Sequence, residues 1–160
     1  MVKIGDSAPE FFLSTPYGVE IILAACLLEG PVLLEFIRGT WDPDSRKRLD
    51  RLARELPRFG EAKTRVITIA CERAQTAARY LEEHPTPVTL LLDEDRRVAR
   101  QYGVLQKFSL PVWNVARPSS FVVDRCGFVR YTYVAQLQIH SADIDEILEV
   151  LKKMERSDPG

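Results

Sequence analysis

Residues 31–45, PVLLEFIRGTWDPDS, join a short apolar run to a strong helix start. The run 31–38 lies between Gly30 and Gly39 and is apolar at nearly every position, which is typical of a strand covered on both faces. Asp42 and Pro43 then supply a capping carboxylate and a proline suited to the first helical position. The stretch therefore predicts a central buried strand that leads into a helix.

Strand-like and helix-like segments alternate on both sides of this stretch, which indicates an α/β fold. Further strands are expected at residues 65–71, 88–92, 119–124 and 128–134, and further helices at 73–83, at 95–102 and over the apolar stripe 144–151, with Ser141 as its cap. Residues 125–127 read as a hairpin turn between two of these strands. The expected architecture is a central mixed β-sheet flanked by helices.

The bulk properties describe one ordinary domain. The chain has 160 residues and a formal net charge of −1, so it lacks the excess of positive charge that is typical of a nucleic-acid binder. No basic start precedes an apolar stretch, and no apolar run reaches the roughly 20 residues of a membrane span. We expect a single domain over residues 1–155, a flexible tail at 156–160, a cytoplasmic location, and neither nucleic acid nor membrane as a partner.

Three cysteines, Cys26, Cys71 and Cys126, stand at no metal-ligand or disulfide-framework spacing. An odd number of thiols without such spacing is typical of a reduced protein. The sequence therefore indicates no metal and no cofactor.

Several segments together resemble the AhpC/TSA branch of the peroxiredoxins and its thioredoxin-like relatives. They are GDSAPEF at residues 5–11, FIRGTW at 36–41, the segment 92–104 and PSSFVVD at 118–124. The resemblance spans nearly the whole chain and implies a thioredoxin-like fold with a peroxiredoxin-type N-terminal extension. It also implies a lineage in redox homeostasis and antioxidant defence.

The resemblance points to Asp42 and Ser45 as the altered site. Peroxiredoxins place threonine at the first position and the peroxide-attacking cysteine at the second, whereas thioredoxin-like relatives place cysteines at both. Pro118 matches a proline that is cis and faces the redox site, and Arg117 lies one residue before the usual place of the site arginine. Arg38 stands where many peroxiredoxins carry proline, and Trp41 completes the expected site.

Two readings of the acidic and hydroxyl side chains stay open. Asp42 and Asp44 cap and charge-complement a helix, or they form an acid/base pair or a metal site. A Ser45 nucleophile would need a histidine, and both His84 and His140 are expected elsewhere in the topology. An alcohol is hardly ionised at neutral pH and lacks the soft sulfur that attacks a peroxide. Conventional peroxidase chemistry is therefore expected to fail.

Cys71 ends a predicted parallel strand, where ligand sites of open α/β sheets lie. It is either a relocated thiol or a packed small residue. Arg38 and Arg117 either create an anion-friendly pocket beside the helix start or form structural ion pairs.

Two further side-chain groups bear on partners. A basic stripe on the helix after residue 43 indicates a solvated face balanced by Asp50 and Glu55, with an acidic partner or nucleic acid as the alternative. It consists of Lys47, Arg51, Arg54 and Arg58. Aromatic residues near the expected site predict a partner surface and a homodimer if they are exposed. These are Trp41, Tyr102, Phe108 and Trp113.

The leading hypothesis is a peroxiredoxin-like protein with a degenerate thiol site that acts as a binding or regulatory protein. Its ligand would be a redox protein, a small anion or a peroxide. The enzyme hypothesis is a thiol peroxidase or disulfide oxidoreductase that uses Cys71, or one in which Ser45 is an engineered replacement of cysteine. A third hypothesis is an anion-binding module built on the helix start with Arg38 or Arg117.

Overall fold

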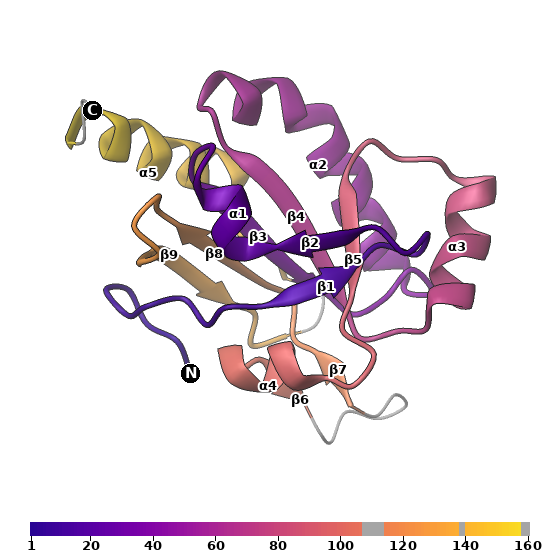
Figure 1. Ribbon diagram of the computed structural model, residues 1–160. Helices are drawn as coiled ribbons and strands as arrows, with labels where there is room; N and C mark the ends of the chain where they lie inside the picture. Colours follow the sequence, from indigo (N-terminus) through magenta and orange to yellow (C-terminus); the bar gives the residue numbers. More distant parts are fainter. Residues whose placement is uncertain (107–113, 138–139, 158–160) are drawn as a thin grey trace.

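A seven-stranded mixed sheet forms the centre of the computed structural model, which describes residues 1–106, 114–137 and 140–157 (Figure 1). Its strand order is β2-β1-β5-β4-β3-β8-β9. The strands are β1 (Phe12–Ser14), β2 (Glu20–Ile22), β3 (Val32–Ile37), β4 (Arg65–Ala70), β5 (Thr89–Leu92), β8 (Ser119–Val123) and β9 (Val129–Val134). The expected mixed α/β architecture is confirmed.

Strand β3 occupies the interior of the sheet, as residues 31–38 predict. All six of its residues are buried. It runs parallel to β4 and antiparallel to β8, so it is hydrogen-bonded along both edges. A strand that is covered on both faces and paired on both edges gives the segment that follows it a fixed starting point.

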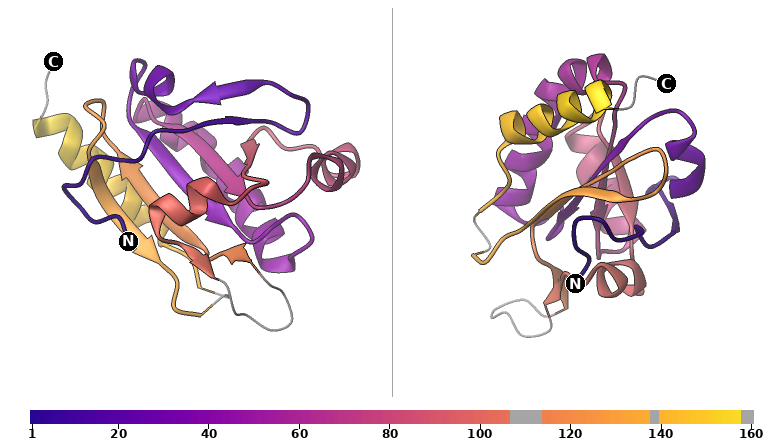
Figure 2. Two further views of the ribbon diagram at one scale, coloured as in Figure 1. Left: turned by 60° about the horizontal axis from the view of Figure 1, so that its bottom comes forward. Right: turned by 90° about the vertical axis from the view of Figure 1, so that its left-hand side faces the viewer.

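Helices cover both faces of the sheet (Figure 2). The helices are α1 (Leu23–Leu27), α2 (Pro43–Glu61), α3 (Ala74–Glu83), α4 (Arg97–Tyr102) and α5 (Ile144–Ser157). Buried residues of α2, α3 and α5 share one apolar cluster with one face of the sheet. Those of α1 and α4 belong to the cluster on the other face. In the right-hand view of Figure 2, α2 and α5 lie side by side.

The N-terminal segment extends the sheet before β3 begins. Strands β1 and β2 form an antiparallel hairpin with Gly18 at a φ of +84°, and Ser14 of β1 pairs with Leu92 of β5. The expected hairpin between β8 and β9 is confirmed, with Gly127 at a φ of +88°.

The final helix begins later than its expected cap. Helix α5 starts at Ile144, and the Asp143 carboxylate accepts a hydrogen bond from the Asp145 amide at 2.8 Å. Asp143 therefore caps the helix, and the prediction of Ser141 as the cap was wrong. Helix α5 continues through Arg156 and Ser157, and residues 158–160 lie outside the described ones.

The segment between α4 and β8 contains a small second sheet. Strands β6 (Leu105–Gln106) and β7 (Val115–Ala116) pair antiparallel. Tyr102, which precedes them, is completely buried and so cannot contribute to an exposed aromatic surface. Phe108 and Trp113, expected in the same surface, lie outside the described residues.

Candidate functional site

The turn from β3 into α2 is built by the residues that the sequence singled out. Asp42 is the N-cap of α2 and Pro43 occupies its first turn, as predicted. The Asp42 carboxylate accepts a hydrogen bond from the Ser45 amide at 2.9 Å, which satisfies one of the free N–H groups at the helix start. The capping role of Asp42 is therefore confirmed.

The Ser45 hydroxyl lies inside this turn with its hydrogen-bonding capacity filled. Its Oγ donates to Asp42 Oδ2 at 2.8 Å and accepts from the backbone amides of Arg38 and Gly39 at 3.1 and 3.4 Å. A serine hydroxyl offers one donor and two acceptor lone pairs, so all three are engaged. Ser45 is 4% exposed. A nucleophile needs a free lone pair directed at its substrate, and Ser45 Oγ has none in this arrangement.

Arg38 closes the other side of the Asp42 carboxylate. Its Nη1 donates to Asp42 Oδ1 at 3.3 Å, and its guanidinium lies 5.1 Å from the centroid of the Trp41 ring. Arg38 Nε is buried and has no hydrogen-bond partner in the described part of the chain. Arg38, Asp42 and Ser45 therefore form one buried network, and Trp41 covers its edge with 38% of its surface exposed.

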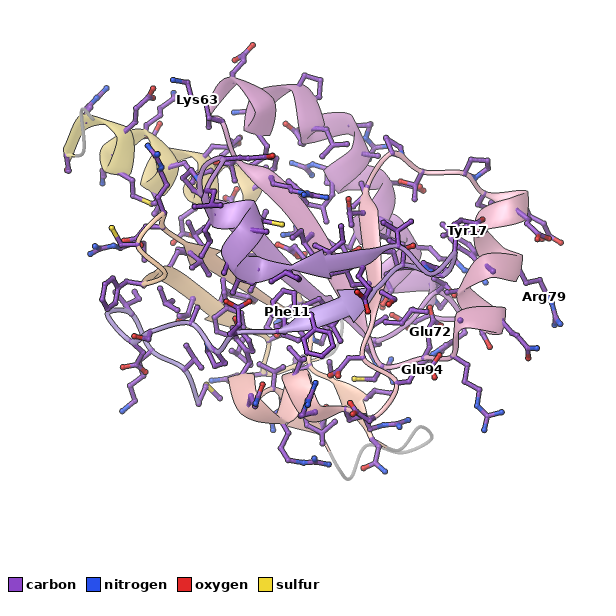
Figure 3. The ribbon with its side chains drawn as sticks, in the orientation of Figure 1. Phe11, Tyr17, Lys63, Glu72, Arg79 and Glu94 are labelled. Carbon is purple, nitrogen blue, oxygen red and sulfur yellow. The ribbon has the colours of Figure 1, made fainter. Side chains whose placement is uncertain are left out.

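The same turn is tied to the end of β4 by Glu72, which sequence reasoning missed. Both Glu72 carboxylate oxygens lie 3.2 Å from the Thr40 amide, and Thr40 Oγ1 donates to Oε2 at 3.1 Å. Burial raises the pKa of the Glu72 carboxyl, against the Thr40 hydrogen bonds and the charge of Arg46, which lower it. Figure 3 labels Glu72 beside α3. The signal available in the sequence was its place just after a parallel strand, where the loops of neighbouring strands meet.

A cavity of about 680 Å³ opens next to Ser45 between α2, the start of β8 and the residues that precede α5. Of the expected site residues, Asp42, Ser45 and Pro118 line it. Arg38, Trp41 and Arg117 are not among the described residues that do so. The backbone amide of Arg117 donates to the Val104 carbonyl at 2.8 Å.

Histidine His140 lies in the wall of this cavity, so the prediction that both histidines are placed elsewhere was wrong for it. His84 is stacked on Tyr80 at 4.7 Å between ring centroids. No hydrogen bond joins either histidine to Ser45 in the described residues. A Ser45 nucleophile activated by histidine is therefore not assembled.

A buried ion pair forms the floor of the cavity. Arg48 on α2 donates to Glu35 on β3 through two nitrogens at 2.9 and 3.0 Å, and Ser120 Oγ donates to Glu35 at 2.6 Å. A third Arg48 nitrogen donates to the Ala142 carbonyl at 2.9 Å. Arg48 thus links the central strand, α2 and the segment that enters α5.

Cys71 faces the opposite side of the sheet from Ser45. It belongs to the apolar cluster beneath α1 and α4, whereas α2 packs on the other cluster. Its Sγ lies 3.9 Å from Asp93 Oδ2, and burial together with the Asp93 charge raises the pKa of the thiol to about 12. Reactive cysteines have lowered pKa values and partial exposure, so these surroundings are those of a packed thiol. Cys26 is also buried, and Cys126 is exposed in the β8–β9 turn.

The described residues contain no group of three or more histidine, cysteine, aspartate or glutamate side chains that could hold a metal ion. Among them, no helix is long and apolar enough to cross a membrane. What remains at the turn is a helix start, a saturated serine and a polar cavity.

This strand, turn and helix start, set in a mixed sheet with an N-terminal hairpin, define the class of thioredoxin-fold peroxiredoxin-like proteins. A solved structure, peroxidoxin BcpB from Mycobacterium tuberculosis, superimposes with a TM-score of 0.85 at 24% identity over 96% of this chain and 99% of that one. AhpC from Mycobacterium bovis gives a TM-score of 0.83 at 15% identity, covering 99% and 95% of the two chains. The thioredoxin-like fold is therefore confirmed.

The chain belongs to the AhpC/TSA family, whose match covers residues 4–132. Peroxiredoxin Q, chloroplastic, from Oryza sativa subsp. japonica is 28% identical over 156 residues, which are 96% of this chain and 68% of the relative. Peroxiredoxin Bcp from Escherichia coli K12 is 26% identical over 135 residues, which are 82% of this chain and 85% of the relative. The resemblance found in the sequence is thus confirmed.

Proposed function

We propose that this member of the AhpC/TSA family does not reduce peroxides through position 45 and acts as a binding or regulatory protein. The observation that carries the proposal is the saturated Ser45 hydroxyl, which is engaged by Asp42, Arg38 and Gly39. The scaffold that would activate a thiol is retained, whereas the group at its centre is an alcohol held in a closed network. Such a site stabilises the turn and leaves the neighbouring cavity for binding.

The enzyme hypothesis has two forms, a relocated thiol at Cys71 and an engineered serine at position 45, and different observations argue against each. A relocated thiol at Cys71 is disfavoured by its burial and by a pKa raised to about 12. An engineered replacement of cysteine at Ser45 would leave Asp42 unexplained, because both related groups carry threonine or cysteine there. Asp42 also pairs with Arg38, so its carboxylate belongs to a network that extends beyond Ser45.

A peroxide-consumption assay with a thiol reductant tests this proposal. We expect no turnover above the rate of free thiols for the unmodified chain or for Cys71→Ala. Turnover by the unmodified chain that is lost in Cys71→Ala would establish the relocated thiol instead. Turnover that survives Cys71→Ala would assign the activity to another residue, and in either case a peroxidase role would replace the binding role.

A homodimer and a cytoplasmic location remain predictions. The relatives named above comprise a chloroplastic protein and one from Escherichia coli, so kinship alone does not assign a compartment. Sedimentation equilibrium of the purified chain would measure its oligomeric state directly.

A further inference from the structure

The cavity beside Ser45 continues along α2, where three basic side chains line it. These are Lys47, Arg51 and Arg54, which we call the basic row. Their spacing of four and three residues places them on one face of the helix. With a rise of 1.5 Å per residue, the row extends over about 10 Å. The cavity is therefore elongated beyond the position of the missing cysteine.

Three of the carboxylates that line the cavity are paired with arginines. Glu35 is bound by Arg48, and Asp42 by Arg38, in two buried ion pairs. Asp145 Oδ1 lies 3.0 Å from Arg58 Nη1, but both side chains are exposed, so this pair neutralises Asp145 only weakly. Arg38 and Arg58 are not among the described residues that line the cavity.

The basic row is not neutralised in the same way. Lys47 and Arg54 have no ion-pair partner in the part of the chain that the structure describes. Arg51 lies 3.7 Å from Glu55, and half of the Arg51 side chain is exposed. Such an exposed pair contributes about 1 kcal/mol or less, so Arg51 can turn toward a ligand at little cost. The expectation that the stripe of Lys47, Arg51, Arg54 and Arg58 is balanced by Asp50 and Glu55 thus holds for two of its four members, because Arg51 and Arg58 both pair with Glu55.

Two further carboxylates face the cavity, and both lie at helix starts. Asp143 caps α5 and accepts the Asp145 amide, while Asp44 stands in the first turn of α2. The positive end of a helix dipole offsets a carboxylate at such a position. Asp44 precedes the basic row by three to ten residues, so Arg54 is the member of the row that lies farthest from it along α2.

We propose that this cavity binds an elongated small molecule with two or more phosphate or carboxylate groups, held by the basic row. A cavity of about 680 Å³ is in the usual range for small-molecule sites. Cationic side chains in a row select for several anionic groups in one ligand, because each group can pair with a different cation. The inference rests on the proposed binding role and replaces Arg38 and Arg117 by the basic row as the groups that hold the anion.

Titration calorimetry of the purified chain at low ionic strength tests the proposal with inorganic orthophosphate, pyrophosphate, tripolyphosphate and citrate. We expect affinity to rise with the number of anionic groups among the phosphates. Citrate shows whether carboxylates are accepted as well, and its binding supports the same oxyanion chemistry. Lys47→Ala and Arg54→Ala are each expected to weaken tripolyphosphate binding about tenfold, because each removes a charge-assisted contact.

Arg79→Ala is the matched control. Arg79 is an exposed arginine on α3, labelled in Figure 3 on the outer side of the molecule, and it has no ion-pair partner among the described residues. We expect this variant to bind as the unmodified chain does. Equal weakening by Arg79→Ala and Arg54→Ala would show unspecific attraction to positive charge and would overturn the proposal. Orthophosphate binding as tightly as tripolyphosphate, or no binding of any of the four probes, would also overturn it.

The two proposals fail separately. Peroxide turnover measured on the same samples would refute the proposed function without affecting the binding data. Absent binding would refute the basic row as a ligand site and would leave the missing peroxidase activity as it stands.

Discussion

Restoring the cysteine alone is expected not to restore a reactive thiol. In Ser45→Cys, sulfur takes the place of an oxygen that lies 2.8 Å from Asp42 Oδ2. The helix start and the amides of Arg38 and Gly39 would favour a thiolate there. The Asp42 carboxylate would oppose it, because two negative charges would then share one buried turn.

The repulsion can be estimated from the geometry. Two unit charges about 4 Å apart interact by about 4 kcal/mol at an effective dielectric constant near 20, which corresponds to about three pKa units. Arg38 pairs with the other carboxylate oxygen at 3.3 Å and offsets part of this repulsion. The pKa of the new thiol is therefore expected to stay at or above the ordinary value near 8.5.

Asp42→Thr/Ser45→Cys should behave differently. The double variant removes the carboxylate, keeps a side chain that can cap α2, and supplies a hydroxyl donor to the sulfur. The thiolate fraction at neutral pH should rise at least about tenfold over that of Ser45→Cys. The pH dependence of iodoacetamide alkylation, measured in a Cys126→Ser background, reports the thiol pKa of both variants.

Asp44→Asn/Ser45→Cys provides the control, because Asp44 is exposed and has no hydrogen bond to Ser45. It removes a carboxylate from the same turn and should leave the thiol as unreactive as in Ser45→Cys. A thiol pKa below about 7 in Ser45→Cys itself, with peroxide turnover equal to that of the double variant, would refute the assigned role of Asp42.

Three other measurements follow from the buried groups. Arg48→Met leaves the Glu35 carboxylate buried without its cation, so urea denaturation should show a loss of about 3 to 5 kcal/mol, and an unchanged midpoint would contradict this. Burial raises the pKa of Glu72 above its ordinary value of 4.5, so the folded protein binds this proton more tightly than the unfolded chain does. The stability that this provides is present below pH 4.5 and is lost as pH rises through the folded-state pKa. Glu72→Gln lacks this titration, so its free energy of unfolding should rise relative to that of the unmodified chain between pH 4 and pH 7. A constant difference between the two would rule out the raised pKa. In native protein, a thiol reagent should label Cys126 rapidly and Cys71 only on unfolding, which mass spectrometry of the labelled peptides can check.

Local chemistry explains which elements the sequence predicts correctly. Strand β3 and the start of α2 follow from an apolar run and from a capping pair, both contained in residues 31–45. Ser141 failed as a cap because Asp143, an equally good capping residue, lies directly before the first helical residue. The choice between two suitable caps depends on where the packed helix begins, which local sequence leaves open.

The parts of the site that sequence reasoning missed depend on tertiary contacts. Thr40 and Glu72 are 32 positions apart, and they meet because β3 and β4 pair in parallel with Ile37 opposite Ala70. His140 enters the cavity wall because the segment before α5 passes along α2. Neither periodicity nor residue spacing predicts these contacts, because they depend on the register of the sheet and on the path of the chain before α5.

The Arg48 contacts make the cavity rigid. The Arg48 side chain on α2 is hydrogen-bonded both to Glu35 of the central strand and to the Ala142 carbonyl of the facing wall. Arg48 thus fixes the distance between α2 and the segment before α5 in the absence of a ligand, so a bound molecule need not immobilise these two walls. The entropy lost on binding is then mostly that of the ligand and of the outer side chains, and the fixed width favours slender molecules over bulky ones.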